Sequence, residues 1–219
     1  MALVVDELGL IVTAAPGSGS TSLLAHFQSY PTARAVPAED RVLDGVVVVD
    51  AKHATVTQLE AAGLISPADL AGKRIVTTTR NPFDFWVAEW HRTRTRWLAE
   101  LRHPESWVYR QEGMIGRIVD AAEHDFDSWL ELALGAAARE GRTMHLNAGH
   151  VAEADVVVRL EHMDEEVAAL TGTSPTGVTV PHVNVTDRDR PYWQWYSAAS
   201  RALVEQVHAP DLARFGYRF

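Results

Sequence analysis

The chain has 219 residues, of which 47% are hydrophobic and 22% are charged, so it is long enough to bury a substantial core. Its 29 acidic and 20 basic residues give a net charge of −9, which argues against non-specific binding to nucleic acid or to an anionic membrane surface. The absence of cysteine excludes disulfides, thiol catalysis and thiolate metal sites. No apolar run reaches membrane-spanning length and the N-terminal segment lacks a basic region, so we expect a cytoplasmic protein without a signal peptide.

Short apolar runs rich in Val, Ile or Thr predict buried strands. They show no alternation of apolar and polar residues, which is typical of a parallel sheet covered by helices on both faces. The predicted strands span residues 10–14, 46–50, 74–79 and 156–160.

Helical patterns lie between and after these runs. Apolar residues recur there at helical spacing, and serine, proline or glycine marks several of the ends. The predicted helices span residues 20–28, 56–62, 66–70, 83–101, 107–122, 127–139, 164–170 and 192–208. Strands that alternate with helices predict an α/β fold, with a doubly wound and mostly parallel sheet in a single domain of residues 1–219. The helices of 83–139 are expected to form an inserted lobe over the ligand-binding edge of the sheet.

The segment from Leu10 to Leu24 runs from an apolar strand through a loop of small residues into a helix. Such a loop lets successive backbone N–H groups point at one spot, and the helix N-terminus adds the positive end of its dipole. This order predicts a site for phosphate or sulfate, with an ordinary Gly/Ser turn as the alternative. The loop lacks the Gly-Lys-Ser/Thr ending of nucleotide-hydrolysing P-loops, which disfavours a P-loop kinase. The candidate residues are Pro16, Gly17, Ser18, Gly19, Ser20, Thr21 and Ser22.

Arg80 directly follows the predicted strand 74–79 and opens the sequence Arg80-Asn81-Pro82. Because the carboxyl ends of parallel strands meet at one sheet edge, we expect this arginine at the edge that carries the loop. A guanidinium group there can grip a second phosphate in bidentate fashion, and a salt bridge to a neighbouring loop is the alternative. Together the two elements favour a ligand with two separated anionic groups.

The two elements, in this order, resemble the sulfotransferases that use 3′-phosphoadenosine 5′-phosphosulfate (PAPS) as the sulfuryl donor. In that family the first loop reads Pro-Lys/Arg-x-Gly-Thr/Ser-Thr and a later signature reads Arg-Asn/Asp-Pro. The matching segments here are Pro16-Gly17-Ser18-Gly19-Ser20-Thr21 and Arg80-Asn81-Pro82-Phe83-Asp84. Residues 158–161, 183–186, 190–192 and 211–219 resemble the late strand and the ending of carbohydrate-type and bacterial members. The resemblance spans nearly the whole chain.

This resemblance implies a role for each element. The loop would hold the 5′-phosphosulfate and Arg80 the 3′-phosphate, with Arg188 and Arg190 as further ligands of that phosphate. The reaction implied is in-line transfer of the sulfuryl group to a hydroxyl or amine of a small-molecule or sugar-containing acceptor, and it requires no metal.

His53 is the expected general base, because the family places a histidine near the end of the corresponding strand and imidazole titrates near neutral pH. Lys52 is expected to stabilise charge on the transferring group. A surface Lys–His pair is the alternative interpretation of these two residues. His91, His182 and Glu89 compete as bases.

Two residues of the family pattern are missing. The loop cation falls at Gly17, and the serine eight positions after the signature arginine falls at Ala88. Lys52, Arg188 or Arg190 is the expected replacement for the missing cation. The alternative is a non-catalytic nucleotide-binding or scaffold protein that has lost this charge.

Trp86, Trp90 and Trp97 recur at helical spacing on the helix after Arg80. Such a stripe belongs either to the core or to a pocket, because aromatic side chains bury large areas. The resemblance implies that Trp86, Trp90 and His91 line the acceptor pocket, which favours an apolar, aromatic or sugar-containing acceptor.

Overall fold

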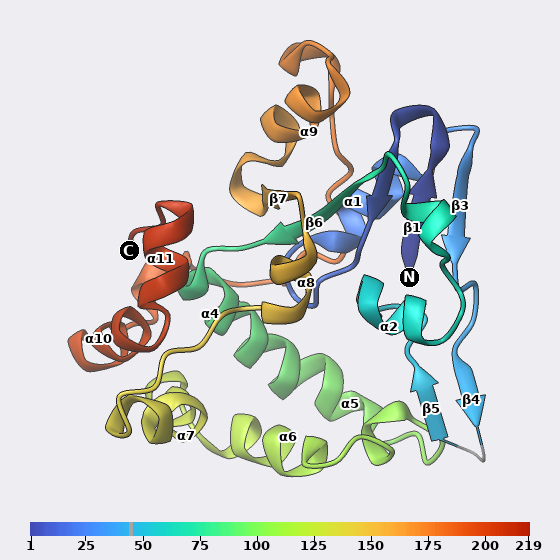
Figure 1. The fold of residues 1–219 in the computed structure, drawn as a ribbon. Coiled ribbons are helices and arrows are strands. Elements are labelled where there is room, and N and C mark those ends of the chain that lie inside the picture. The colour runs from blue at the N-terminus through green and yellow to red at the C-terminus, as the bar shows by residue number, and fades with distance from the viewer. Residues whose placement is uncertain (44–45) are drawn as a thin grey trace. The chain divides into compact units, whose positions relative to one another are not determined.

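The structure is a computed structural model, and it describes residues 1–43 and 46–219. The chain divides into two compact units, each assembled from two segments of the sequence. The first unit contains residues 1–80 and 147–185, and the second contains residues 81–146 and 186–219. The strands that are described all belong to the first unit, whereas the second unit is helical (Figure 1). The single domain expected from the sequence stays a prediction.

The first unit contains a five-stranded sheet, a separate two-stranded sheet and several helices. Its strands are β1 (Ala2–Val5), β2 (Leu10–Val12), β3 (Ala33–Val36), β4 (Arg41–Leu43), β5 (Val46–Val49), β6 (Arg74–Thr79) and β7 (Val156–Arg159). Its helices are α1 (Ser20–Phe27), α2 (Val56–Ala61), α3 (Pro67–Leu70), α8 (Ala148–Glu153) and α9 (Met163–Thr171). The large sheet has the order β3-β1-β2-β6-β7. In this sheet β1 runs antiparallel to β2 and β3, whereas β2, β6 and β7 run parallel to one another. The expected α/β fold with a mostly parallel sheet is therefore confirmed.

Side chains of the large sheet alternate between two hydrophobic clusters, because successive residues of a strand point to opposite faces. On β2, Val12 packs in one cluster with Phe27 of α1 and Val167 of α9. Ile11 packs in the other cluster with Leu59 of α2. Burying a side chain such as Phe27 contributes roughly 1.5–3 kcal/mol. Helices therefore cover both faces of this sheet, as the lack of alternation predicts.

The run 46–50 does not join the large sheet, so its prediction as a buried strand of a parallel sheet was wrong. Its residues Val46–Val49 form β5, which pairs with β4 in an antiparallel sheet of its own. Val47 and Val48 are exposed, whereas Val49 is buried. A run of valines without alternation does not reveal which face of the strand is covered by other residues. The apolar pattern also did not predict the strands β1 and β3.

The second unit consists of helices around a core of its own. These helices are α4 (Pro82–Arg92), α5 (Leu98–Glu100), α6 (Met114–Glu123), α7 (Phe126–Arg139), α10 (Ala198–Val207) and α11 (Ala209–Phe215). A π-helical turn at Thr93–Trp97 joins α4 to α5 within the predicted helix 83–101. The helices predicted over 107–122 and 192–208 begin later than expected, after short 3₁₀ turns. The short helices α8 and α11 were not predicted.

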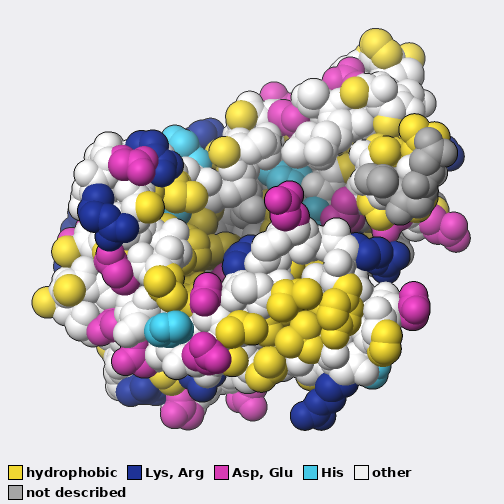
Figure 2. All heavy atoms as spheres, turned by 90° about the horizontal axis from the view of Figure 1, so that it is seen from below, with side chains coloured by type: hydrophobic (Ala, Val, Ile, Leu, Met, Phe, Trp, Pro, Cys, Tyr) yellow, Lys and Arg dark blue, Asp and Glu magenta, His cyan; other side chains and the backbone are white. Residues whose placement is uncertain are grey.

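Figure 2 views the face on which α5 and α6 lie, and hydrophobic side chains gather there in a patch. Leu98, Ile115 and Val119 are exposed on these two helices. On the inner side, Met114 and Ile118 of α6 are buried with Val108. The amphipathic helix α6 therefore buries one stripe and leaves apolar surface on another.

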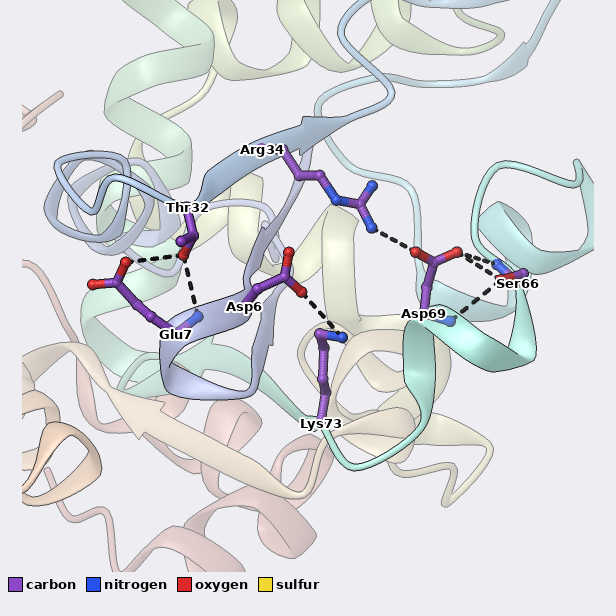
Figure 3. Close-up of polar contacts among 7 residues, drawn as sticks. All are labelled: Asp6, Glu7, Thr32, Arg34, Ser66, Asp69 and Lys73. Carbon is purple, nitrogen blue, oxygen red and sulfur yellow. Dashed lines mark hydrogen bonds and ion pairs between the residues drawn. The ribbon is translucent and has the colours of Figure 1, made fainter.

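Polar side chains tie β3 and the β1–β2 connection to the segment around α3 (Figure 3). The carboxylate of Asp69 accepts hydrogen bonds from Ser66 N at 2.9 Å and Ser66 Oγ at 2.7 Å, and it pairs with Arg34 Nη2 at 2.6 Å. Lys73 pairs with Asp6 at 3.1 Å. The hydrogen bonds from Ser66, with a smaller contribution from Arg34, lower the pKa of Asp69 to about 2.

The substitution Asp69→Asn tests this cap. A carboxyl whose pKa is lowered in the folded chain stabilises the fold above its ordinary pKa of 3.8 and loses this effect as the pH falls toward 2. We expect a lower Tm for Asp69→Asn than for the wild type at neutral pH, and a difference that shrinks below about pH 4. Glu140→Gln, which removes an exposed carboxylate paired only with Arg142, serves as the control. Equal Tm values for Asp69→Asn and wild type at neutral pH would contradict the expectation.

Candidate functional site

The loop between β2 and α1 has the backbone geometry of a tight strand-to-helix turn. Gly17 and Gly19 adopt left-handed conformations, with φ values of 72° and 83°. A Cβ atom on Gly19 would lie 2.4 Å from Cδ1 of Leu160. Glycine is therefore required at position 19 both by the backbone conformation and by the close contact.

Five successive N–H groups of this loop, those of residues 17–21, make no hydrogen bond with the described residues. The first N–H groups inside the helix that do find acceptors belong to Ser22 and Leu23, which both donate to Gly19 O. Backbone N–H groups in turns with left-handed residues, next to a helix N-terminus, are the typical donors of an anion site. The predicted loop therefore offers unpaired donors at the carboxyl end of β2.

The carbonyl oxygens of residues 14–17 are, in contrast, held by side chains. His53 Nδ1 donates to Ala14 O at 2.7 Å, and Ser18 Oγ and Ser20 Oγ donate to Ala15 O at 2.8 and 2.9 Å. The next two carbonyls, of residues 16 and 17, accept hydrogen bonds from an asparagine and an arginine at 3.0 and 3.3 Å. The protein thus fixes the acceptors of residues 14–17 and leaves the donors of residues 17–21 available.

The hydroxyl groups of the loop serve the structure more than an open site. Ser18 is fully buried, and its Oγ lies 2.5 Å from Thr78 Oγ1 in addition to its bond to Ala15. Ser22 Oγ accepts a hydrogen bond from Val183 N at 3.0 Å. Thr21 is half-buried and Pro16 is exposed. The free donors of the loop are therefore its backbone N–H groups, because the hydroxyl groups of Ser18 and Ser22 already have partners within the protein.

Arg80 follows β6, the parallel neighbour of β2, so its position at the same sheet edge is confirmed. Its Nη1 donates to Gly17 O at 3.3 Å. The guanidinium group therefore lies beside the loop, at the residue where the resemblance leads us to expect a cation.

His53 lies in the turn between β5 and α2, and the structure brings its ring to the end of β2. Because a carbonyl oxygen only accepts, the bond to Ala14 O fixes the proton of the neutral ring on Nδ1 and leaves the lone pair on Nε2. Burial lowers the pKa of His53, and the Ala14 bond and the charge of Asp50 oppose this shift. Lys52 is exposed, and its charge lowers the pKa of His53 further.

The two arginines predicted as further phosphate ligands lie in the second unit. Arg188 pairs with Asp84 at 2.6 Å. The guanidinium carbon of Arg190 lies 3.6 Å from the ring centroid of Trp195. Their roles at a phosphate stay predictions.

Trp86 and Trp90 belong to the core of the second unit. Trp86 Nε1 donates to His208 Nε2 at 3.0 Å. Trp90 is 2% exposed and also lines a cavity of about 410 Å³ together with Arg94, Arg190 and Trp195. The aromatic stripe therefore contributes to the core and, at Trp90, to the wall of a cavity.

His91 and Glu89, two of the competing bases, lie in the second unit. Burial, followed by the charge of Arg188, lowers the pKa of His91, whose ring lies edge-to-face against Trp195. Glu89 is buried and pairs with Arg92 and Arg117, which neutralise its charge. Glu89 is therefore engaged in two ion pairs within the second unit.

His182 is exposed and lines a cavity of about 250 Å³ in the first unit, next to Ser22. Glu161, Asp164 and Glu165 line the same cavity, and the described lining residues include no Lys or Arg. A cavity of this charge is poorly suited to a phosphate. Ala88, where the resemblance expects a serine, is completely buried in the second unit.

Three side chains near the loop were missed by sequence reasoning. They are Asn147, which donates to Pro16 O, and His150 and Glu153, which contact the turn that carries His53 and the start of α2. The sequence holds a faint signal, because all three precede the predicted strand 156–160. No motif in the sequence links these three residues to the loop or to the turn of His53.

Within the described part of the chain, no helix is long and apolar enough to cross a membrane. In the same residues, no group of three or more His, Asp or Glu side chains is placed to hold a metal ion. A scan against models of protein families, a search of curated proteins and a search of solved structures each found no match.

Proposed function

We propose that the chain is a sulfotransferase that binds PAPS at the loop between β2 and α1, which would act as a P-loop-like anion cradle. The observation that carries the proposal is the row of N–H groups of residues 17–21 without acceptors, at the carboxyl end of a parallel strand. Donors of this kind bind phosphate and sulfate oxygens without a charged side chain in the loop.

Arg80 supports the proposal by supplying positive charge at the loop. The hydrogen bond to Gly17 O holds its guanidinium group at the position where related loops carry lysine or arginine. Hydrogen bonds from a guanidinium to a phosphate are charge-assisted and short, so one such group can replace a loop cation. Arg80 would then act at the 5′-phosphosulfate, or bridge toward the 3′-phosphate that the resemblance assigns to it.

His53 is the base in this proposal. The acceptor oxygen or nitrogen attacks sulfur, the bond from sulfur to the bridging oxygen breaks, and adenosine 3′,5′-bisphosphate leaves. The acceptor proton passes to Nε2 of His53, the nitrogen that the bond to Ala14 O leaves unprotonated. Lys52 would stabilise charge on the transferring group.

The acceptor would be a small molecule or a sugar-containing compound. In the second unit, Trp90 and Trp195 face a cavity of about 410 Å³, a volume typical of small-molecule sites. The indole rings favour aromatic or sugar rings, and the carboxylates of Glu123, Asp125 and Asp127 in the same lining disfavour extended polyanions.

A specific observation favours the second candidate, a non-catalytic nucleotide-binding protein. Ser18 Oγ and Ser20 Oγ both donate to Ala15 O, so neither hydroxyl proton is free for a transferring sulfuryl group. A protein of this kind would bind the bisphosphate and would not transfer sulfuryl groups.

Binding of adenosine 3′,5′-bisphosphate tests the nucleotide site. We expect it to raise the Tm selectively, with smaller effects of ADP and ATP, because a ligand of the native state stabilises it. Arg80→Ala should weaken bisphosphate binding about 10- to 100-fold in calorimetry, the loss of a hydrogen bond to a charged group. Arg74→Ala removes the same charge from the other end of β6 and should bind like the wild type. If none of the three nucleotides changes the Tm, the site is not a nucleotide site.

Transfer from PAPS to a panel of phenols, sugars and amines tests the base. On the best acceptor, His53→Ala should lower kcat by about 10²–10⁴-fold and weaken bisphosphate binding by no more than about fivefold, the loss of the one hydrogen bond to Ala14 O. Because burial lowers the pKa of His53, its neutral form persists below the ordinary value of 6.5, so the rate should fall only at a pH below that value. The exposed His103→Ala is the matched control. An unchanged kcat for His53→Ala would rule out this base, and bisphosphate binding without any transfer would favour the non-catalytic candidate.

A further inference from the structure

The segment 147–153, which comprises α8 and the residue before it, contacts both loops of the proposed site. Asn147 adopts a left-handed conformation with φ of 55°, and its Nδ2 donates to Pro16 O at 3.0 Å instead of capping α8. His150 Nε2 donates to His53 O at 3.1 Å. A single short segment therefore holds the loop of free N–H groups and the residue that carries the proposed base.

The last residue of α8 strengthens the second of these contacts. Glu153 accepts hydrogen bonds from Val56 N at 2.7 Å and from Thr57 N at 3.3 Å, the first two N–H groups of α2. Helix α8 lies beside α2 and β6 in the first unit (Figure 1). Because α2 begins three residues after His53, a carboxylate fixed at its N-terminus also limits movement of the preceding turn.

The surroundings of His150 favour one tautomer and one hydrogen bond of its ring. It is 6% exposed, and its donor bond to His53 O fixes its proton on Nε2. Nδ1 of His150 is buried without a hydrogen bond to the described residues. Burial lowers the pKa of His150, so the ring stays neutral and keeps a single N–H donor. Removing this donor would leave the partly buried carbonyl of His53 without its His150 partner, which favours a rearranged turn.

We propose that the segment 147–153 is a positioning element, in which Asn147 fixes the anion loop and His150 with Glu153 fixes the turn that carries His53. The inference rests on the proposed function, because it names what holds the donor loop and the base in place. These three side chains act through other residues, and small misplacements of reacting groups are costly in rate.

The first experiment reports on the turn that carries His53 and needs no assay of activity. Nitrogen-15 NMR of His53 reports its tautomer and pKa in the wild type, in His150→Leu and in His150→Gln. The charges of Asp50, Lys52 and the Met1 amino group act on His53 and are unchanged in these variants. His53 also interacts with the ring of His150 itself, which burial keeps neutral in the wild type.

We expect His150→Leu to weaken the preference for the Nδ1–H tautomer and to raise the pKa of His53 toward 6.5 as the turn opens to water. His150→Gln keeps an N–H donor near the position of Nε2 and should restore the wild-type titration. Glu153→Ala, at a partly exposed side chain, should shift the titration in the same direction and provides the test if His150→Leu does not fold.

The second experiment separates the two halves of the segment. Asn147→Ala should weaken adenosine 3′,5′-bisphosphate binding by about fivefold, the loss of one hydrogen bond, without changing the His53 titration. His150→Leu should lower kcat by about 10- to 100-fold and leave bisphosphate affinity within about twofold.

A His53 titration that is identical in wild type, His150→Leu and Glu153→Ala would overturn the inference for the turn. Wild-type bisphosphate affinity in Asn147→Ala would overturn it for the loop. Failure of the wild type itself to bind the bisphosphate would overturn the proposed function instead, and the NMR result would still decide whether α8 holds the turn of His53.

Discussion

The proposed site depends on a difference between the carbonyl and the N–H groups of the loop between β2 and α1. Each carbonyl of residues 14–17 accepts a hydrogen bond from a side chain, whereas the N–H groups of residues 17–21 have no acceptor among the described residues. Because these carbonyl oxygens already accept hydrogen bonds from side chains, the loop is not free to rearrange so that they pair with its own N–H groups. The consequence is a row of donors that is organised before any ligand arrives, which is the condition for strong anion binding.

Short sequence patterns predicted those parts of the proposed site that lie within one continuous segment of the chain. Glycines, small residues and an apolar strand predicted the loop and α1, and the position of Arg80 after a strand placed it at the correct edge. The parallel pairing of β2 with β6 makes that prediction work, because it brings the two strand ends together. The bonds from Asn147, His150 and Glu153 span about a hundred residues of sequence, and no periodic pattern encodes contacts of that range.

The errors in the fold have a related cause. The valines of β5 have the composition of a buried strand, yet β5 pairs with β4 outside the large sheet, and β1 and β3 occupy positions in that sheet which the pattern left empty. Composition reports how apolar a strand is and not which neighbour it pairs with. In the second unit, Trp86 and Trp90 show the same ambiguity, because one helical stripe serves a core and borders a cavity.

We propose that the free N–H groups of residues 17–21 bind the phosphate groups of PAPS and of its product, adenosine 3′,5′-bisphosphate. Amide NMR spectra of the full chain, titrated with adenosine 3′,5′-bisphosphate, test it most directly. We expect saturable shifts that are largest at the amides of residues 17–21, with a change at the Arg80 guanidinium. Shifts confined to other segments, with these amides unmoved at saturation, would contradict it.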